Sequence, residues 1–340
     1  MRRMLAIIGA LVLLTHGAQA QTRSEIPIKE TVLSNNLRLY SIPITIGGTT
    51  IEAGLDTGSA GIRVLPDTLA AGDVKILERA ADANFSSGVR YQGDVVSGRI
   101  TLGELSVPMK LEAVRTVSCA PGHPNCPATR IPPSDYGVRG DSLTGGRFRA
   151  IFGIRDMDEA LDNPLTALGV KRWIVELPRS GETGRLILNP TDAELADYVR
   201  LPRLSNPPIG MHDALNGCIA NTKVKICGAL LMDSGAPNIR VTGKLRGQRD
   251  DGDAWKSGAA AALIFSDNNG PRALENVVID QPEQGSNIRF EDDRSLVIFA
   301  GTAPYLAFDV LYEPSKNQIG LKPRPATADS PTASLVAPQK

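Results

Sequence analysis

The 340-residue sequence predicts a mainly β fold made of two similar β lobes with a central cleft between them. Short runs rich in Val, Ile and aromatic residues are separated by clusters of Gly, Pro, Asn and Asp, which is typical of short strands joined by turns. A ten-residue stretch also occurs twice, as LDTGSAGIRV at 55–64 and as MDSGAPNIRV at 232–241, with five identical positions. Two similar halves of a β protein indicate two lobes related by a pseudo-two-fold axis.

The same order of elements surrounds each copy of the repeat. The stretches IPITIGGTTIEAGLD and CIANTKVKICGALLMD each predict a hairpin whose second strand ends in Asp, at Asp56 and at Asp233. Further along each half, RAIFGI and LVIFAG are apolar runs that contain Gly153 and Gly301. We therefore predict an N-terminal lobe over 21–192 and a C-terminal lobe over 193–322.

Strands are predicted along most of the chain, including those of the two hairpins. Eleven runs fit this description: 40–46, 50–55, 98–103, 110–115, 172–177, 184–188, 224–232, 261–266, 276–280, 287–290 and 295–300. Two segments favour short helices, at 158–169 and 190–199, the second with Thr191 or Asp192 as its cap. The composition of 323–340 predicts a disordered tail.

The first 20 residues have the pattern of a secretory signal peptide. A basic MRRM start precedes the apolar run LAIIGALVLL, which is too short to span a bilayer, and AQA before Gln21 is a typical cleavage site. We expect export to the periplasm or the extracellular space, with no membrane anchor in the mature chain. Basic and acidic residues balance at 37 each, so no strong field favours nucleic acid. The expected partner is a peptide or protein substrate of a monomer.

Four cysteines lie in two close pairs in the sequence. Three pairings are formally possible, and local pairing, Cys119 with Cys126 and Cys218 with Cys227, is the simplest for an exported protein. His123 lies inside the first pair, but CAPGHPNC lacks the spacing of a zinc motif, so no metal is expected.

The two Asp-Ser/Thr-Gly turns are the candidate site. One such turn alone is ordinary, because these residues are favoured in turns, but a matched pair on similar strands predicts chemistry. Glycine beside each carboxylate lets the two backbones approach closely. Two carboxylates that close share one proton, so that one acts as a base toward water and the other as an acid toward the substrate. The predicted catalytic pair is Asp56 and Asp233.

From about Tyr40 to Lys322 the chain resembles the pepsin-like aspartic peptidases. Asp56-Thr57-Gly58-Ser59 and Asp233-Ser234-Gly235 are similar to the two active-site motifs of that family. The resemblance implies an exported endopeptidase without a cofactor, in which Ser59 bonds Asp56, and Thr57 and Ser234 brace the two loops against each other.

The resemblance also implies a flap, a β-hairpin that closes over the substrate. Tyr91 and Gly93 in YQGDVVSG, followed by Gly98, are similar to the flap tyrosine and its glycine.

Two positions depart from the family pattern. Arg63 stands where a Trp usually bonds the flap tyrosine. Two interpretations stay open: its guanidinium donates to the phenolic oxygen in place of the Trp, or it is an exposed arginine of a strand. Ala236 stands where many members carry a hydroxyl that favours the ionised carboxylate, so activity is expected in mildly acidic to near-neutral conditions.

Two other functions fit parts of the sequence. A catalytically degenerate relative would keep the cleft and bind peptide, carbohydrate or a partner protein, and the sequence leaves this alternative open. Gly140-Asp141-Ser142-Leu143 spells an esterase nucleophile motif, but no Asp-x-x-His occurs to activate the serine, so a loop is the better interpretation.

Overall fold

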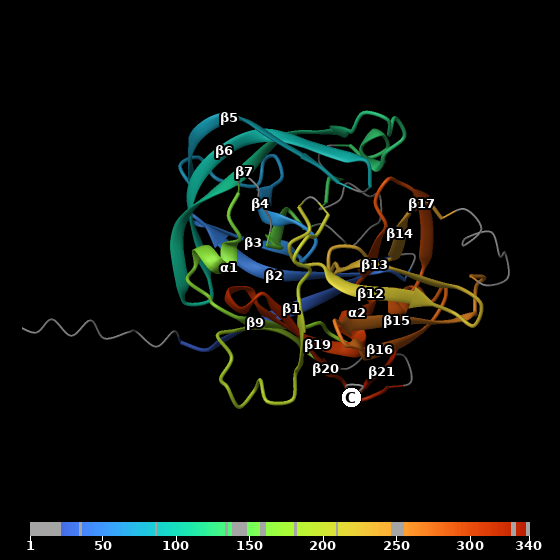
Figure 1. Ribbon diagram of the computed structural model, residues 1–340. Coiled ribbons are helices and arrows are strands. Elements are labelled where there is room, and N and C mark those ends of the chain that lie inside the picture. Colours follow the sequence, from blue (N-terminus) through green and yellow to red (C-terminus); the bar gives the residue numbers. More distant parts are fainter. Residues whose placement is uncertain are drawn as a thin grey trace, which may run out of the picture.

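The computed structural model describes residues 22–33, 36–85, 87–132, 135–137, 148–156, 161–179, 182–208, 210–245, 255–327 and 331–337. Residues 1–20, the predicted signal peptide, and the 140–143 motif lie outside these ranges. The described chain is mainly β and forms two sheets, as Figure 1 shows, so the predicted β class is confirmed.

Among the described residues, the larger sheet contains thirteen strands. In chain order they are β1 (Ser24–Val32), β2 (Arg38–Ile46), β3 (Thr49–Asp56), β4 (Ala60–Val64), β5 (Val74–Asn84), β6 (Val89–Leu102), β7 (Leu105–Cys119), β8 (Ala150–Ile154), β9 (Trp173–Glu176), β10 (Gly184–Leu188), β11 (Val199–Pro202), β19 (Phe308–Glu313) and β20 (Gln318–Pro323).

The second sheet contains eight strands in the described part of the chain. They are β12 (Leu215–Ala220), β13 (Lys225–Met232), β14 (Ile239–Gly243), β15 (Ala260–Asp267), β16 (Gly270–Val278), β17 (Ile288–Asp292), β18 (Val297–Gly301) and β21 (Thr332–Leu335). The helices are short: α1 (Pro164–Ala167), α2 (Ala303–Ala307), and the 3-10 turns η1 (Pro127–Thr129), η3 (Pro282–Gln284) and η4 (Pro314–Lys316).

The internal repeat extends over five strands of each sheet. The orders β2-β3-β8-β4-β7 and β12-β13-β18-β14-β17 match strand by strand. In both sets a hairpin leads to the Asp turn, the second hairpin strand is parallel to the central strand, and the strand after the turn is antiparallel to it. The last strand of each set runs parallel to its neighbour. A ten-residue repeat in the sequence therefore marks a much longer structural repeat.

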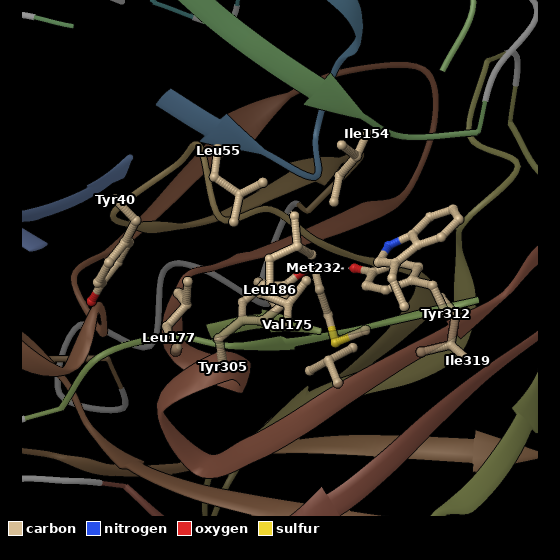
Figure 2. Packing of buried hydrophobic residues seen from close by; sticks show 14 of the residues in the cluster. Tyr40, Leu55, Ile154, Val175, Leu177, Leu186, Met232, Tyr305, Tyr312 and Ile319 are labelled. Carbon is tan, nitrogen blue, oxygen red and sulfur yellow. Dashed lines mark hydrogen bonds between the residues drawn. The ribbon is translucent and has the colours of Figure 1, made fainter. Parts of the chain in front are cut away.

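The strands at the centre of each set are mostly hydrophobic along their whole length, without alternating polar residues. This pattern is typical of strands whose sheet is covered on both faces. Every residue of β4 and β8 is buried. One large hydrophobic cluster includes residues of both sheets and lies beneath the two Asp turns. Figure 2 shows Leu55 and Met232, the residues before Asp56 and Asp233, within this cluster.

The two sheets do not coincide with the two predicted lobes. Strands β11, β19 and β20 lie after residue 192, yet they join the first sheet beside β9 and β10. In Figure 1, β19 and β20 lie at the lower centre of the view, well below the long strands β5–β7. The predicted boundary at 192/193 thus divides the chain into halves but does not divide the sheets.

Three local predictions differ from the structure. In the segment 158–169 only Pro164–Ala167 is helical among the described residues, capped by Asn163. In the segment 190–199, residues 192–197 form turns instead of a helix, and Val199 begins β11. In the tail, residues 332–335 form β21 and pair with β16, so disorder is wrong for them.

Both local disulfide pairings are confirmed. Cys119, at the end of β7, is bonded to Cys126, and Cys218 is bonded to Cys227, its register partner across the β12–β13 hairpin. Within the described ranges, no helix has both the length and the apolar composition that crossing a membrane requires.

Candidate active site

The two Asp turns lie at equivalent points of the repeat. Asp56 ends β3 and is the register partner of Gly153 on β8, while Asp233 follows β13 and its backbone N–H donates to the carbonyl of Gly301 on β18. A side chain at Gly153 would meet the Ser59 carbonyl at 2.6 Å, and one at Gly301 would meet the Asn238 carbonyl at 2.4 Å. Glycine is therefore required where each central strand passes its Asp turn.

Thr57 and Ser234 connect the two turns through reciprocal hydrogen bonds. The Thr57 N–H donates to Ser234 Oγ at 3.1 Å, and the Ser234 N–H donates to Thr57 Oγ1 at 2.9 Å. Each hydroxyl also donates across the pair, Thr57 to the Met232 carbonyl at 3.2 Å and Ser234 to the Leu55 carbonyl at 2.8 Å. Both side chains are buried, so these bonds fix the separation of the turns.

The glycine of each turn packs against the carboxylate of the other. A Cβ on Gly58 would lie 2.3 Å from Cγ of Asp233, and a Cβ on Gly235 would lie 2.4 Å from Oδ1 of Asp56. Any larger residue would displace the facing carboxylate. The structure therefore brings the two predicted aspartates together, each against the other's turn.

The hydrogen bonds at Asp56 follow the sequence-based expectation. Its Oδ1 accepts from the Gly58 N–H and its Oδ2 accepts from the Ser59 hydroxyl, both at 2.8 Å. Ala236 occupies the equivalent of Ser59 in the second turn and has no hydroxyl. The two aspartates consequently have different surroundings on otherwise similar turns.

A buried chain of hydroxyls supports Thr57 from below. The Tyr305 hydroxyl lies 2.7 Å from Thr57 Oγ1 and 2.5 Å from the Tyr312 hydroxyl. Because Thr57 gives its one proton to the Met232 carbonyl, Tyr305 donates to Thr57 and Tyr312 donates to Tyr305. Burial raises the pKa of Tyr305 well above its usual range, so this phenol keeps the proton that it donates. Figure 2 shows both rings within the core beneath the turns.

The two aspartates line one large cavity. Its volume is about 760 Å³, and its wall includes Asp56, Asp233, Ser59 and Ala236 from the turns. Other parts of the wall come from the β5–β6 hairpin and from β14 and β18. A cavity of this size is typical of sites that bind small molecules or several residues of a peptide.

The aromatic residue that the hairpin places in the cavity is Phe85, not Tyr91. Phe85 begins the turn between β5 and β6 and lines the cavity. Tyr91 is only 1% exposed, and it packs at 4.8 Å from the Phe85 ring within a separate core cluster. Tyr91 therefore packs behind Phe85 and is not part of the cavity wall.

Gly93 and Gly98 have packing roles. A Cβ on Gly93 would lie 2.2 Å from the Ala113 carbonyl, next to the register shift between β6 and β7. A Cβ on Gly98 would lie 3.0 Å from Val74. Neither glycine lines the cavity.

Arg63 is a buried residue of β4 that lies against the β5–β6 hairpin. Its guanidinium lies 6.0 Å from the centre of the Phe85 ring, pairs with Glu112 at 3.2 Å and donates to the Ala60 carbonyl. Cations attract the faces of aromatic rings at such distances. Arg63 thus links the strand after the first Asp turn to the phenyl ring of the hairpin, and its expected contact with Tyr91 stays a prediction.

Sequence reasoning missed two further arginines of the cavity wall. Arg155 follows β8, and its guanidinium donates to the Gly58 carbonyl at 3.0 Å, which holds the first turn from behind. Arg240 is the counterpart of Arg63, since each lies seven residues after its Asp. The repeat itself contained the signal for Arg240.

No protein-family model matches the chain, and no curated protein matches it either.

Proposed function

We propose that the protein is an aspartic endopeptidase that uses Asp56 and Asp233 to activate water for hydrolysis of a peptide bond. The observation that carries the proposal is the symmetric contact of each turn glycine with the other turn's carboxylate, at the wall of a 760 Å³ cavity. Together with the pepsin-like motifs, this supports a two-lobed fold of that type with the aspartates at the floor of the cleft.

The proposed reaction needs one proton shared by the pair. The ionised carboxylate removes a proton from water while the water oxygen bonds to the peptide carbonyl carbon, and the protonated carboxyl gives its proton to the carbonyl oxygen. As the C–N bond of the tetrahedral intermediate breaks, the leaving amine takes the proton that the first carboxylate removed from water. A hydroxyl of the intermediate returns its proton to the other carboxylate as the new carbonyl forms, which restores the shared proton. The Thr57–Ser234 bonds support this chemistry because catalysis of this kind depends on fixed positions of the reacting groups.

A non-catalytic peptide-binding protein is the second candidate. The cavity supports this candidate because its size suits a peptide whether or not the aspartates cleave it, and Phe85 and Ser87 of the β5–β6 hairpin line it. Such a hairpin would still cover a bound peptide.

The test is cleavage of a mixed peptide library by the chain beginning at Gln21, across pH 3 to 8, with and without pepstatin. We expect cleavage that pepstatin blocks and that Asp56→Asn and Asp233→Asn each abolish. Asp192→Asn is the matched control, since that carboxylate is exposed and far along the chain from both turns. Pepstatin-sensitive turnover that survives in either dyad variant would contradict the proposal.

A further inference from the structure

We propose that the cleft selects peptides with an acidic side chain and that Arg240 is the residue that recognises it. This inference rests on the proposed function only in taking a peptide as the occupant of the cleft. The chemistry recognised is a carboxylate, supplied by a Glu or Asp side chain of the peptide.

Arg240 lies on the part of the wall that follows the second Asp turn. It belongs to β14, four residues after Ala236, and lines the same cavity as Asp233 and Ala236. Its side chain is 25% exposed and forms part of the cavity wall, so a ligand in the cavity can reach it.

The neighbouring strand fixes the plane of this guanidinium. Arg240 and Phe299 are register partners on β14 and β18, and the guanidinium carbon lies 4.0 Å from the centre of the Phe299 ring. Stacking occupies a face of the guanidinium but leaves the N–H groups along its edge available. A planar fork of N–H donors matches a carboxylate through two parallel hydrogen bonds.

The present ion pair of Arg240 does not prevent this. Its partner is Glu291, whose side chain is 48% exposed and contacts Arg240 Nη1 at 3.1 Å. Ion pairs with such exposed partners contribute little net free energy, because water screens them. A carboxylate that enters the cavity can therefore bind the remaining N–H groups or displace Glu291.

The counterpart in the first half shows a different arrangement. Arg63 is only 6% exposed and pairs with Glu112, which is 2% exposed, so its charge is balanced inside the protein. Both arginines line the cavity, but only Arg240 combines a fixed orientation with solvent access and an exposed partner. The repeat thus provides two arginines, one for the hairpin and one for the ligand.

The experiment compares peptides that differ only by Glu or Gln at each position in turn, with amidated C-termini, at a pH above the usual glutamate pKa of about 4.3. At one position, we expect kcat/KM for the Glu peptide to exceed that for the Gln peptide by about tenfold. This is the size of effect expected from one charge-assisted pair of hydrogen bonds. Arg240→Met should reduce this ratio to about 1, because the advantage of the Glu peptide over the Gln peptide is lost. Arg240→Lys keeps the charge without the fork, and an intermediate ratio is expected.

Arg99→Met is the matched control, because Arg99 is exposed on β6 and does not line the cavity. The thermal unfolding transition of Arg240→Met shows whether the variant is folded. If the folded variant still prefers Glu peptides, the inference is overturned. A preference that requires a free peptide C-terminus would also overturn it, because the terminal carboxylate would then be the group recognised.

If no peptide is cleaved, the proposed function fails, but the inference is still tested by binding of the same peptides measured by calorimetry. Tighter binding of a Glu peptide that Arg240→Met removes supports the inference, whereas equal binding of Glu and Gln peptides overturns it.

Discussion

Thr57 and Ser234 exchange hydrogen bonds between positions 177 residues apart: each backbone N–H donates to the other's hydroxyl, at 3.1 and 2.9 Å. Since each hydroxyl also donates to the carbonyl before the opposite Asp, four bonds hold the turns together. The turns belong to different sheets, so this pair is a direct mechanical link between them.

Thr57→Val removes one hydroxyl with little change of shape. The Ser234 N–H, the Met232 carbonyl and the Tyr305 hydroxyl each lose a buried partner, so we expect the free energy of unfolding to fall by about 2–4 kcal/mol. Urea denaturation with the disulfides intact measures this. Thr45→Val is the control: its hydroxyl bonds Thr50 on an exposed surface, and a change within about 0.5 kcal/mol is expected. If Thr57→Val and Thr45→Val lower the free energy of unfolding equally, the bonds between the two turns contribute no more to stability than an exposed hydrogen bond.

Alanine at Gly58 or Gly235 should displace a carboxylate. The new methyl group would lie 2.3 Å from Asp233 Cγ or 2.4 Å from Asp56 Oδ1, too close for either to stay in place. If the dyad is catalytic, misplacement of about 1 Å should reduce kcat/KM by roughly 100-fold.

Gly48→Ala is the control for these variants, because its Cβ would meet nothing closer than 3.6 Å. Crystal structures of the variants check the displacement whether or not the protein is an enzyme. Unmoved aspartates in Gly58→Ala would contradict the packing described above.

Arg63→Met should destabilise the protein because Glu112 would lose its cation inside the core. Removal of one partner of a buried ion pair costs about 3–5 kcal/mol, and we expect a loss near 3 kcal/mol by urea denaturation. The double variant with Glu112→Met should recover most of it, since two apolar side chains then replace the pair. Arg90→Met breaks the more exposed pair with Asp82 and should cost about 1 kcal/mol or less. A double variant no more stable than Arg63→Met would show that the buried charge is not the cause.

The strands and the two Asp turns could be predicted from short stretches of the sequence. Apolar runs predicted most strands, and the ten-residue repeat located Asp56 and Asp233 on equivalent turns. The hydroxyl partners Thr57, Ser234 and Ser59 followed from the resemblance, and the structure places all three as expected.

What the sequence could not supply depends on register and on distant pairing. Tyr91 was predicted as the flap residue, but its side chain is buried on β6, and the aromatic residue of the hairpin that lines the cavity is Phe85. The strand β21 forms only because the edge of β16 offers backbone partners, which the composition of the tail does not reveal. The Phe299 ring beneath Arg240 likewise depends on the pairing of β14 with β18.

Glu275 should make stability depend on pH. It lies on β16, fully buried, and neither carboxyl oxygen has a hydrogen-bond partner among the described residues. Burial raises the pKa of this carboxyl well above its usual 4.5, because water can no longer solvate the charge.

The sign follows from proton binding. Between pH 4.5 and the raised pKa, the folded chain holds a proton that the unfolded chain has released, so the free energy of unfolding falls as pH rises through that window. The slope contributed by this one group is up to about 1.4 kcal/mol per pH unit. Below pH 4.5 both states are protonated and the stability is fully present.

Glu275→Met should remove this slope, so the variant should gain stability over the natural chain as the pH rises from 4.5 toward 8. Urea denaturation at a series of pH values measures the difference. Glu104→Met is the matched control at an exposed turn, and its difference from the natural chain should be small at every pH. A gain for Glu275→Met that is the same at pH 4 and pH 8 would mean that apolar packing, not ionisation, is responsible.

The strand β21 should be part of this effect. Glu275 is the register partner of Ala333, and opposite residues of an antiparallel pair point to the same face, so the Ala333 methyl group covers the carboxyl from the edge of the sheet. Removal of residues 328–340 should admit water to Glu275, bring its pKa back toward 4.5 and flatten the pH dependence of stability. The loss of the contacts made by β21 itself should lower stability at every pH. In the Glu275→Met background the same truncation should lower stability by an amount that does not change between pH 4.5 and 8. If truncation leaves the slope of the natural chain intact, β21 is not what keeps water from Glu275.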